Sequence, residues 1–179
     1  TAMKKIFVLG FLSVLFVSCN SRTEFQTVKI KNRYSLELPD YMGEAKNLNT
    51  EASLQYQNTF RELYAIVLDE PKTDFPNPGE VNLENFADIV RGNLDSTLKN
   101  PTFSATRDTV INGLKAKLFS LSDGSEGVNI YYQFAYIESK NHFYQILTWT
   151  LENRKDQFTK DMDKIIASFK ELEPKSRAK

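Results

Sequence analysis

The chain has 179 residues, with 23 lysines and arginines against 23 aspartates and glutamates, so its formal net charge is zero. This balance argues against nucleic acid as the main partner, because proteins that bind the phosphate backbone normally carry a basic excess. The single cysteine excludes a disulfide within one chain and a metal site built from several thiolates.

The first segment is positively charged and then apolar. Lys4 and Lys5 precede the stretch Ile6–Val17, and Ser18 and Cys19 follow it. A stretch of about 12 apolar residues suits a signal peptide and falls short of the roughly 20 that a membrane-spanning helix needs. No other apolar stretch of the sequence approaches that length. We therefore expect the segment to be removed.

The ending of this segment resembles the lipobox of bacterial lipoprotein precursors. In that family a peptidase cleaves before the cysteine, whose thiol carries a diacylglyceryl group and whose new amino group is usually acylated as well. The resemblance implies a signal peptide over residues 1–18, with Ser18 flanking the cleavage site, and a lipid-attachment site at Cys19. Thr1 and Ala2 precede the expected start at Met3 and are left out of the fold argument.

Residues 19–24 are then expected to form a short lipidated tether. Without Lys4 and Lys5 the rest of the chain has a net charge of about −2. Some related lipoproteins carry an acidic run behind the cysteine that directs them to the cell surface, and Glu24 alone does not make such a run. The expected location is the cell envelope, on the periplasmic face of the outer membrane.

A single domain is expected over residues 25–173, followed by a disordered tail over 174–179. Alternating apolar and polar residues predict its first strands, and a continuous apolar run predicts a central strand covered on both faces. The expected strands are 25–31, 34–39, 52–57 and 63–68. The stretch 71–80 contains three prolines and a glycine and is expected to be a loop.

Two amphipathic helices are predicted from apolar residues at helical spacing. The first begins after Asn82, which is expected to be its N-cap, and is closed by Pro101. The second covers residues 152–172. Their apolar stripes are Leu83, Phe86, Ala87, Val90, Leu94 and Leu98 in the first helix, and Phe158, Met162, Ile165, Ile166 and Phe169 in the second.

Two hairpins are predicted between the helices. Asn112-Gly113 suits a type I′ turn and joins expected strands at 103–111 and 115–121. A second turn is expected at 123–127, followed by aromatic strands at 128–137 and 143–151. A loop at Lys140-Asn141 places Ser139 opposite His142, and this register keeps the largest apolar side chains on one face. The other face still holds Tyr131, Tyr144 and Ile146, so both faces should be at least partly covered.

This order of elements resembles the PsbP-like fold. The stretches that carry the resemblance are Tyr34–Pro39, Val110–Leu114, Phe143–Thr148 and Ile165–Phe169. The fold is shared by photosystem PsbP proteins, a eukaryotic Ran-binding import factor and many bacterial lipoproteins of unassigned role. It implies an α+β domain, an antiparallel sheet packed between helices as an α/β/α sandwich. The family's usual tryptophan behind the strand-ending proline is replaced by Tyr41-Met42. No activity is carried over with the resemblance.

The chemical groups in the sequence do not favour an enzyme. His142, the only histidine, is expected at a hairpin tip as a solvated turn residue. Residues 123–127 could be a weak cation loop, although a plain turn is favoured, and no other carboxylates have calcium-loop spacing. The sequence contains no Gly-x-Ser-x-Gly elbow and no phosphate-binding glycine pattern. We expect no catalytic residues, no cofactor and no metal.

Tyr131 and Tyr144 are the candidate binding residues. They could line an open groove, although aromatic residues at such positions more often cover a sheet beneath a helix. The sequence thus predicts a membrane-tethered, non-enzymatic binding or assembly protein, with the bilayer and an envelope protein as partners. The alternative is a small-ligand carrier with a cystatin-like or nuclear-transport-factor-like curved sheet, and a hydrolase is third.

Overall fold

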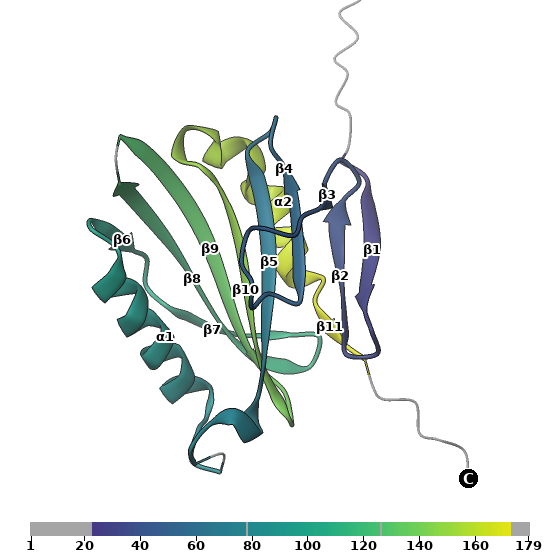
Figure 1. Cartoon of the computed structure of the whole chain (residues 1–179), viewed down its shortest axis with the longest axis vertical. Coiled ribbons are helices and arrows are strands. Elements are labelled where there is room, and N and C mark those ends of the chain that lie inside the picture. The colour runs from purple at the N-terminus through teal and green to yellow at the C-terminus, as the bar shows by residue number, and fades with distance from the viewer. Residues whose placement is uncertain (1–22, 78, 126, 173–179) are drawn as a thin grey trace, which may run out of the picture.

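The computed structural model describes residues 23–77, 79–125 and 127–172, which form two antiparallel sheets and two α-helices (Figure 1). Ser18, Cys19 and the tail 174–179 lie outside the described residues. The large sheet has the order β3-β4-β5-β10-β9-β8-β6, and β7 also pairs with β8. Its strands are β3 (Gly43–Glu44), β4 (Leu54–Asn58), β5 (Leu63–Pro71), β6 (Pro101–Phe103), β7 (Arg107–Ile111), β8 (Leu114–Ser125), β9 (Val128–Glu138) and β10 (His142–Leu151).

The small sheet and the helices complete the domain. The small sheet has the order β1-β2-β11, with β1 (Phe25–Ile30), β2 (Tyr34–Pro39) and β11 (Lys170–Glu171). The helices are α1 (Leu83–Thr97) and α2 (Lys155–Ala167), with short 3-10 turns at Lys72–Asp74 and Glu152–Arg154. Within the described ranges no helix is both long and apolar enough to cross a bilayer.

The large sheet is covered on both faces, as the aromatic strands predicted. Helix α1 packs on one face, while α2 and the small sheet pack on the other. The apolar layer between α1 and the sheet contains Leu83, Phe86, Phe119, Leu121, Phe134, Tyr136 and Phe143. The layer under α2 contains Tyr34, Leu36, Leu38, Ala135, Ile137, Ile146, Phe158, Met162, Ile165 and Phe169, among others. The domain therefore has two apolar layers that share one sheet.

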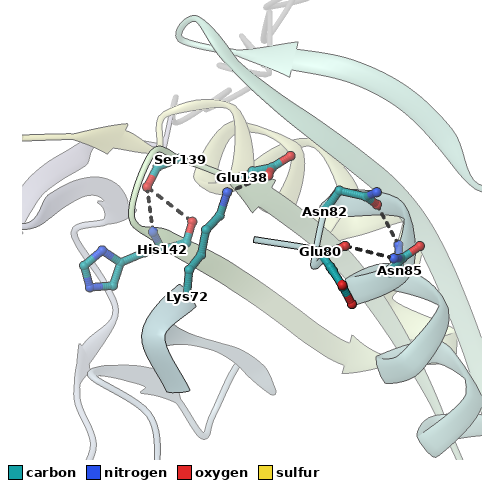
Figure 2. Close-up of polar contacts among 7 residues, drawn as sticks. All are labelled: Lys72, Glu80, Asn82, Asn85, Glu138, Ser139 and His142. Carbon is teal, nitrogen blue, oxygen red and sulfur yellow. Dashed lines mark hydrogen bonds and ion pairs between the residues drawn. The ribbon is translucent and has the colours of Figure 1, made fainter. Parts of the chain in front are cut away.

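The predicted turns at 112–113 and 140–141 and the predicted cap of α1 are confirmed. Phe143 pairs with Glu138, and the Ser139 N–H donates to the His142 carbonyl at 2.9 Å, so the β9–β10 register is the predicted one. Asn112 and Gly113 have φ values of 46° and 88°, as a type I′ turn requires. The Asn82 side chain caps α1 by accepting from the Asn85 N–H at 3.0 Å (Figure 2).

Four predicted boundaries are wrong, and the first is the end of the central strand β5, which continues from the expected residue 68 to Pro71. The strand expected over 103–111 is divided into β6 and β7. The turn expected at 123–127 starts later, because β8 continues to Ser125 and Asp123 pairs with Ile130. The last helix covers only Lys155–Ala167, since Phe169 is fully buried in the core and the next two residues pair with β2. The two-residue strands β3 and β11 have no pattern of their own and were not expected.

Candidate functional site: the β7–α2 groove

The edge of the large sheet contains a bulge between β6 and β7. Phe103 pairs with Leu121, whereas Arg107 pairs with Leu118, so residues 104–106 face only two residues of β8. Ser104 bridges the irregularity, because its N–H donates to the Ser120 carbonyl at 2.9 Å and its Oγ accepts from the Ser120 N–H at 2.8 Å. Such bulges bend an edge strand and interrupt its pairing, which explains why one predicted strand became two.

A groove of about 630 Å³ lies between this edge and α2. Helix α2 packs over β9, β10 and β2, and the part of this sheet face next to β7 forms the floor of the groove. We call it the β7–α2 groove. Its main lining residues are Arg107, Thr109, Ile111, Leu118, Ser120, Tyr131, Gln133, Asp163 and Ile166. Its outer rim, residues 104–107 and Val110, is exposed, so the groove opens to solvent.

Gln133 is the polar group at the floor of the groove. Gln133 is only 8% exposed, and its Nε2 donates to Asp163 Oδ1 at 3.0 Å. Its Oε1 accepts no hydrogen bond from the residues that the structure describes. Leaving a buried acceptor unsatisfied costs about 1–3 kcal/mol. A ligand that donates an N–H or O–H to this oxygen would recover that cost.

The floor continues into a polar layer beneath α2. Thr148 pairs with Gln133, and Thr150 pairs with Tyr131, across the β9–β10 ladder. Both threonines are fully buried, and their hydroxyls lack a partner among the described side chains and backbone groups. This polar layer interrupts the apolar residues that α2 covers.

The two sides of the groove carry opposite charges. Arg107 on β7 is exposed and forms no ion pair within the described part of the chain. Asp163 on α2 is also exposed and uses one oxygen to hold Gln133. Leu118 between them is partly exposed. The groove therefore combines apolar lining residues, one buried acceptor at its floor and a charged group on each side.

The structure separates the two tyrosines predicted as binding residues. Tyr131 is 6% exposed and lines the groove, with Lys155 Nζ 4.3 Å from its ring centroid. Tyr144 is 1% exposed and packs against both Tyr34 and Phe169, so it belongs to the core. Burial, followed by the charge of Glu171, raises its pKa.

His142 lies at the tip of the β9–β10 hairpin, as expected (Figure 2). Its backbone is held by Ser139, and its ring stacks on Tyr144 at 5.7 Å. Its imidazole points away from the nearby ion pair between Lys72 and Glu138 (Figure 2). Among the described residues, no three metal-ligating side chains lie close enough together to hold an ion. The arrangement around His142 is that of a turn.

Gln133 and Asp163 were not identified from the sequence. Gln133 lies on the same face of β9 as Tyr131, but a glutamine on a strand gives no local sign of burial, because its burial depends on where α2 lies. Asp163 directly follows Met162 of the apolar stripe, as a solvated residue on a helix flank would. The available signal was a run of polar residues, Gln133, Thr148 and Thr150, inside an otherwise apolar face.

Comparisons with known proteins identify the fold. No protein-family model matches the sequence, and no curated protein matches it significantly. The solution structure of the cyanobacterial PsbP protein CyanoP from Synechocystis superposes with a TM-score of 0.63 at 11% identity, over 86% of this chain and 95% of that one. The chain thus has the PsbP-like fold, an α+β domain with a large antiparallel sheet and two helices.

Two further structures share the fold at similarly low identity. LpqN of Mycobacterium tuberculosis, described as involved in cell envelope biogenesis, has a TM-score of 0.59 at 12% identity, over 84% of this chain and 91% of that one. PA94 of Pseudomonas aeruginosa, a protein of unknown function described as a putative regulator, has a TM-score of 0.54 at 14% identity, over 85% of this chain and 98% of that one.

Proposed function

We propose that this chain is a lipid-anchored, non-enzymatic binding protein of the cell envelope, tethered through Cys19, which holds a segment of a partner protein in the β7–α2 groove. The observation that carries the binding role is the groove itself, with the unsatisfied Gln133 carbonyl at its floor. The leader sequence and its terminal cysteine support the anchor. The periplasmic face of the outer membrane is the proposed location.

An extended protein segment suits the groove best. Strand β7 pairs only with β8 within the described residues, so its outer side remains free to pair with an added strand. Gln133 lies on β9, two strands further in, so the hydrogen bond to its carbonyl would come from the part of the segment that turns into the groove, where Arg107 and Asp163 select charges at the two sides. This combination of backbone pairing and pocket contacts is how many domains bind peptides.

The alternatives have less support. A small-ligand carrier needs an enclosed apolar cavity, whereas the groove opens to solvent and has a polar floor. A hydrolase needs converging polar groups with shifted pKa values, and the marked pKa shifts belong to tyrosines, raised mainly by burial. The fold shared with LpqN, described as acting in envelope biogenesis, fits the proposed compartment.

Photocrosslinking in living cells tests the binding role. A photoreactive phenylalanine at Val110, on the rim of the groove, should form an adduct with a partner, whereas the same residue at Ile89 on α1 should not. Both positions are exposed, at 65% and 52%. The Thr109→Trp substitution fills the groove and should abolish the adduct. Thr102→Trp, on β6 outside the groove, is the matched control.

Loss of the adduct with both tryptophan variants, or with neither, would contradict the proposal. An adduct at Ile89 equal to that at Val110 would also contradict it, because capture would then not depend on the groove. Purifying the adduct would identify the partner and show whether the crosslinked segment is extended.

A further inference from the structure

Phe60 is an apolar ring held almost entirely in water. It lies in the turn between β4 and β5 and is 94% exposed, whereas the other exposed large apolar side chains of the described residues do not exceed 65%. Exposed single apolar residues are common on proteins. Phe60 differs in two ways. Hydrogen bonds hold its turn in place, and this turn lies at the same end of the domain as Thr23.

The β4–β5 turn is fixed by several contacts. The Arg61 N–H donates to Asn58 Oδ1 at 2.9 Å, and Asn58 Nδ2 donates to the Tyr41 carbonyl at 2.6 Å. The Arg61 guanidinium lies 4.2 Å from the Tyr41 ring centroid, and Arg154 Nη1 donates to the Phe60 carbonyl at 3.0 Å. The backbone that carries Phe60 is therefore ordered, and the ring is held outward.

The same contacts place this turn beside the start of the domain. Tyr41, on which Arg61 packs, donates its hydroxyl to Asp161 Oδ2 at 2.7 Å. Thr23 donates to the same oxygen at 3.3 Å. Figure 1 shows β1 starting at the end of the molecule that carries the β4–β5 turn, while β7 lies toward the other end. Thr23 and Phe60 thus share one end of the domain.

We propose that this end lies on a lipid bilayer and that the Phe60 ring enters the headgroup region. The proposal rests on the lipid anchor at Cys19. Cys19 precedes Thr23 by four residues, and four residues span at most about 14 Å. An anchored Cys19 would therefore hold the end that carries Phe60 next to the membrane surface. Because the tether keeps the ring there, a weak apolar contact is enough to set the orientation.

The charges around Phe60 indicate an apolar rather than an electrostatic contact. Arg61 follows Phe60 and Arg154 contacts its backbone carbonyl, but Glu62, Glu152 and Asp161 lie in the same region, so the described residues form no basic cluster there. Polybasic membrane sites lose affinity at high salt, whereas apolar insertion does not. Docking of this end should therefore persist in high salt.

Depth-dependent quenching tests the proposal on the anchored full chain. The protein is reconstituted into vesicles of phosphatidylethanolamine and phosphatidylglycerol that contain doxyl-labelled lipid. An environment-sensitive dye is attached to Thr59→Cys, an exposed residue beside Phe60, or to Val110→Cys as the distant control. An acylated Cys19 has no free thiol, so the dye labels only the introduced cysteine. Quenching is expected at position 59 and not at position 110, in low and high salt.

Substitution of Phe60 tests whether the ring is responsible. Phe60→Asp should reduce quenching at position 59 about twofold or more, while Phe60→Leu should retain it. Equal quenching at positions 59 and 110, or no effect of Phe60→Asp, would overturn the docking proposal and leave the anchor intact. A wild-type chain whose Cys19 thiol still reacts with the dye would instead show that the anchor is absent, and the docking proposal would fall with it.

Discussion

Gln133 is the residue on which the proposed binding role depends most. Proteins rarely bury a side-chain carbonyl without a hydrogen-bond donor, and the exceptions call for an explanation. Asp163 orients Gln133 by accepting a hydrogen bond from its amide N–H₂. The carbonyl oxygen of the same amide therefore points away from Asp163 and has no donor among the described residues. A buried carbonyl without a donor lowers stability, so this arrangement is not explained by a role in folding. It is explained if a bound ligand supplies the missing donor.

Replacing Gln133 with leucine should separate stability from binding. Leucine removes the unsatisfied acceptor, and Asp163 is exposed and can be solvated instead. We expect the free energy of unfolding to change by no more than about 1 kcal/mol, measured by chemical denaturation. The Val110 adduct should be lost in the same variant. A fully retained adduct would show that the Gln133 carbonyl takes no part in binding.

Tyr34 should make the protein sensitive to alkali. Burial raises the pKa of Tyr34 from 10.0 to about 12, although the Ser53 hydrogen bond and the charge of Arg33 oppose the rise. Between these two values the unfolded chain releases a proton that the native protein keeps. The contribution of Tyr34 to the free energy of unfolding is therefore complete below pH 10 and is lost as the pH rises towards 12. The difference in pKa corresponds to about 3 kcal/mol.

The Tyr34→Phe variant measures this contribution. Its free energy of unfolding should fall less steeply than that of the wild type between about pH 10 and pH 12. At neutral pH the variant should be about 1 kcal/mol less stable, because the hydrogen bond to Ser53 is lost. Parallel curves for the two proteins in the alkaline range would contradict the assignment to Tyr34.

Among the elements, the β7–β8 hairpin connects the groove to the end of α2. Asn112 Nδ2 donates to the Phe169 carbonyl at 2.6 Å and to the Ala167 carbonyl at 3.3 Å. The same residue adopts a φ of 46°, which asparagine tolerates better than most residues. Asn112 therefore serves both as a turn residue and as a hydrogen-bond donor to the carbonyls at the C-terminal end of α2.

Two substitutions at Asn112 separate these roles. Asn112→Gly keeps the left-handed backbone and loses only the side-chain hydrogen bonds, which should lower the free energy of unfolding by about 1 kcal/mol. Asn112→Ala should lower it by about 1–2 kcal/mol more, because alanine disfavours a positive φ. Chemical denaturation of both variants checks the order. An alanine variant as stable as the glycine variant would refute the backbone contribution.

The sequence was most informative where a local pattern was strong. The alternation in Tyr34–Pro39, the Asn112-Gly113 turn and the β9–β10 register are determined by neighbouring residues, and all three are confirmed. The bulge at Ser104 and the two-residue strands depend on distant partners, and no local pattern signals them. The groove depends on how far α2 extends across the sheet, so it became visible only in the folded domain.

At the scale of the whole molecule, the proposals give the domain an orientation. Thr23 and Phe60 mark one end, which we place against the bilayer. The β7 edge lies toward the opposite end in Figure 1, so the rim that β7 contributes to the groove would lie away from the membrane. A partner could then reach the groove without competing with lipid, as suits an accessory protein of the envelope.

Acylation of Cys19 is the central claim, because the location and the orientation both depend on it. Cells expressing the wild type or the Cys19→Ala variant would be grown with an alkynyl fatty acid, and the purified proteins compared for covalent label. The account predicts a labelled wild type and an unlabelled variant. Labelling of both proteins, or of neither, would contradict it.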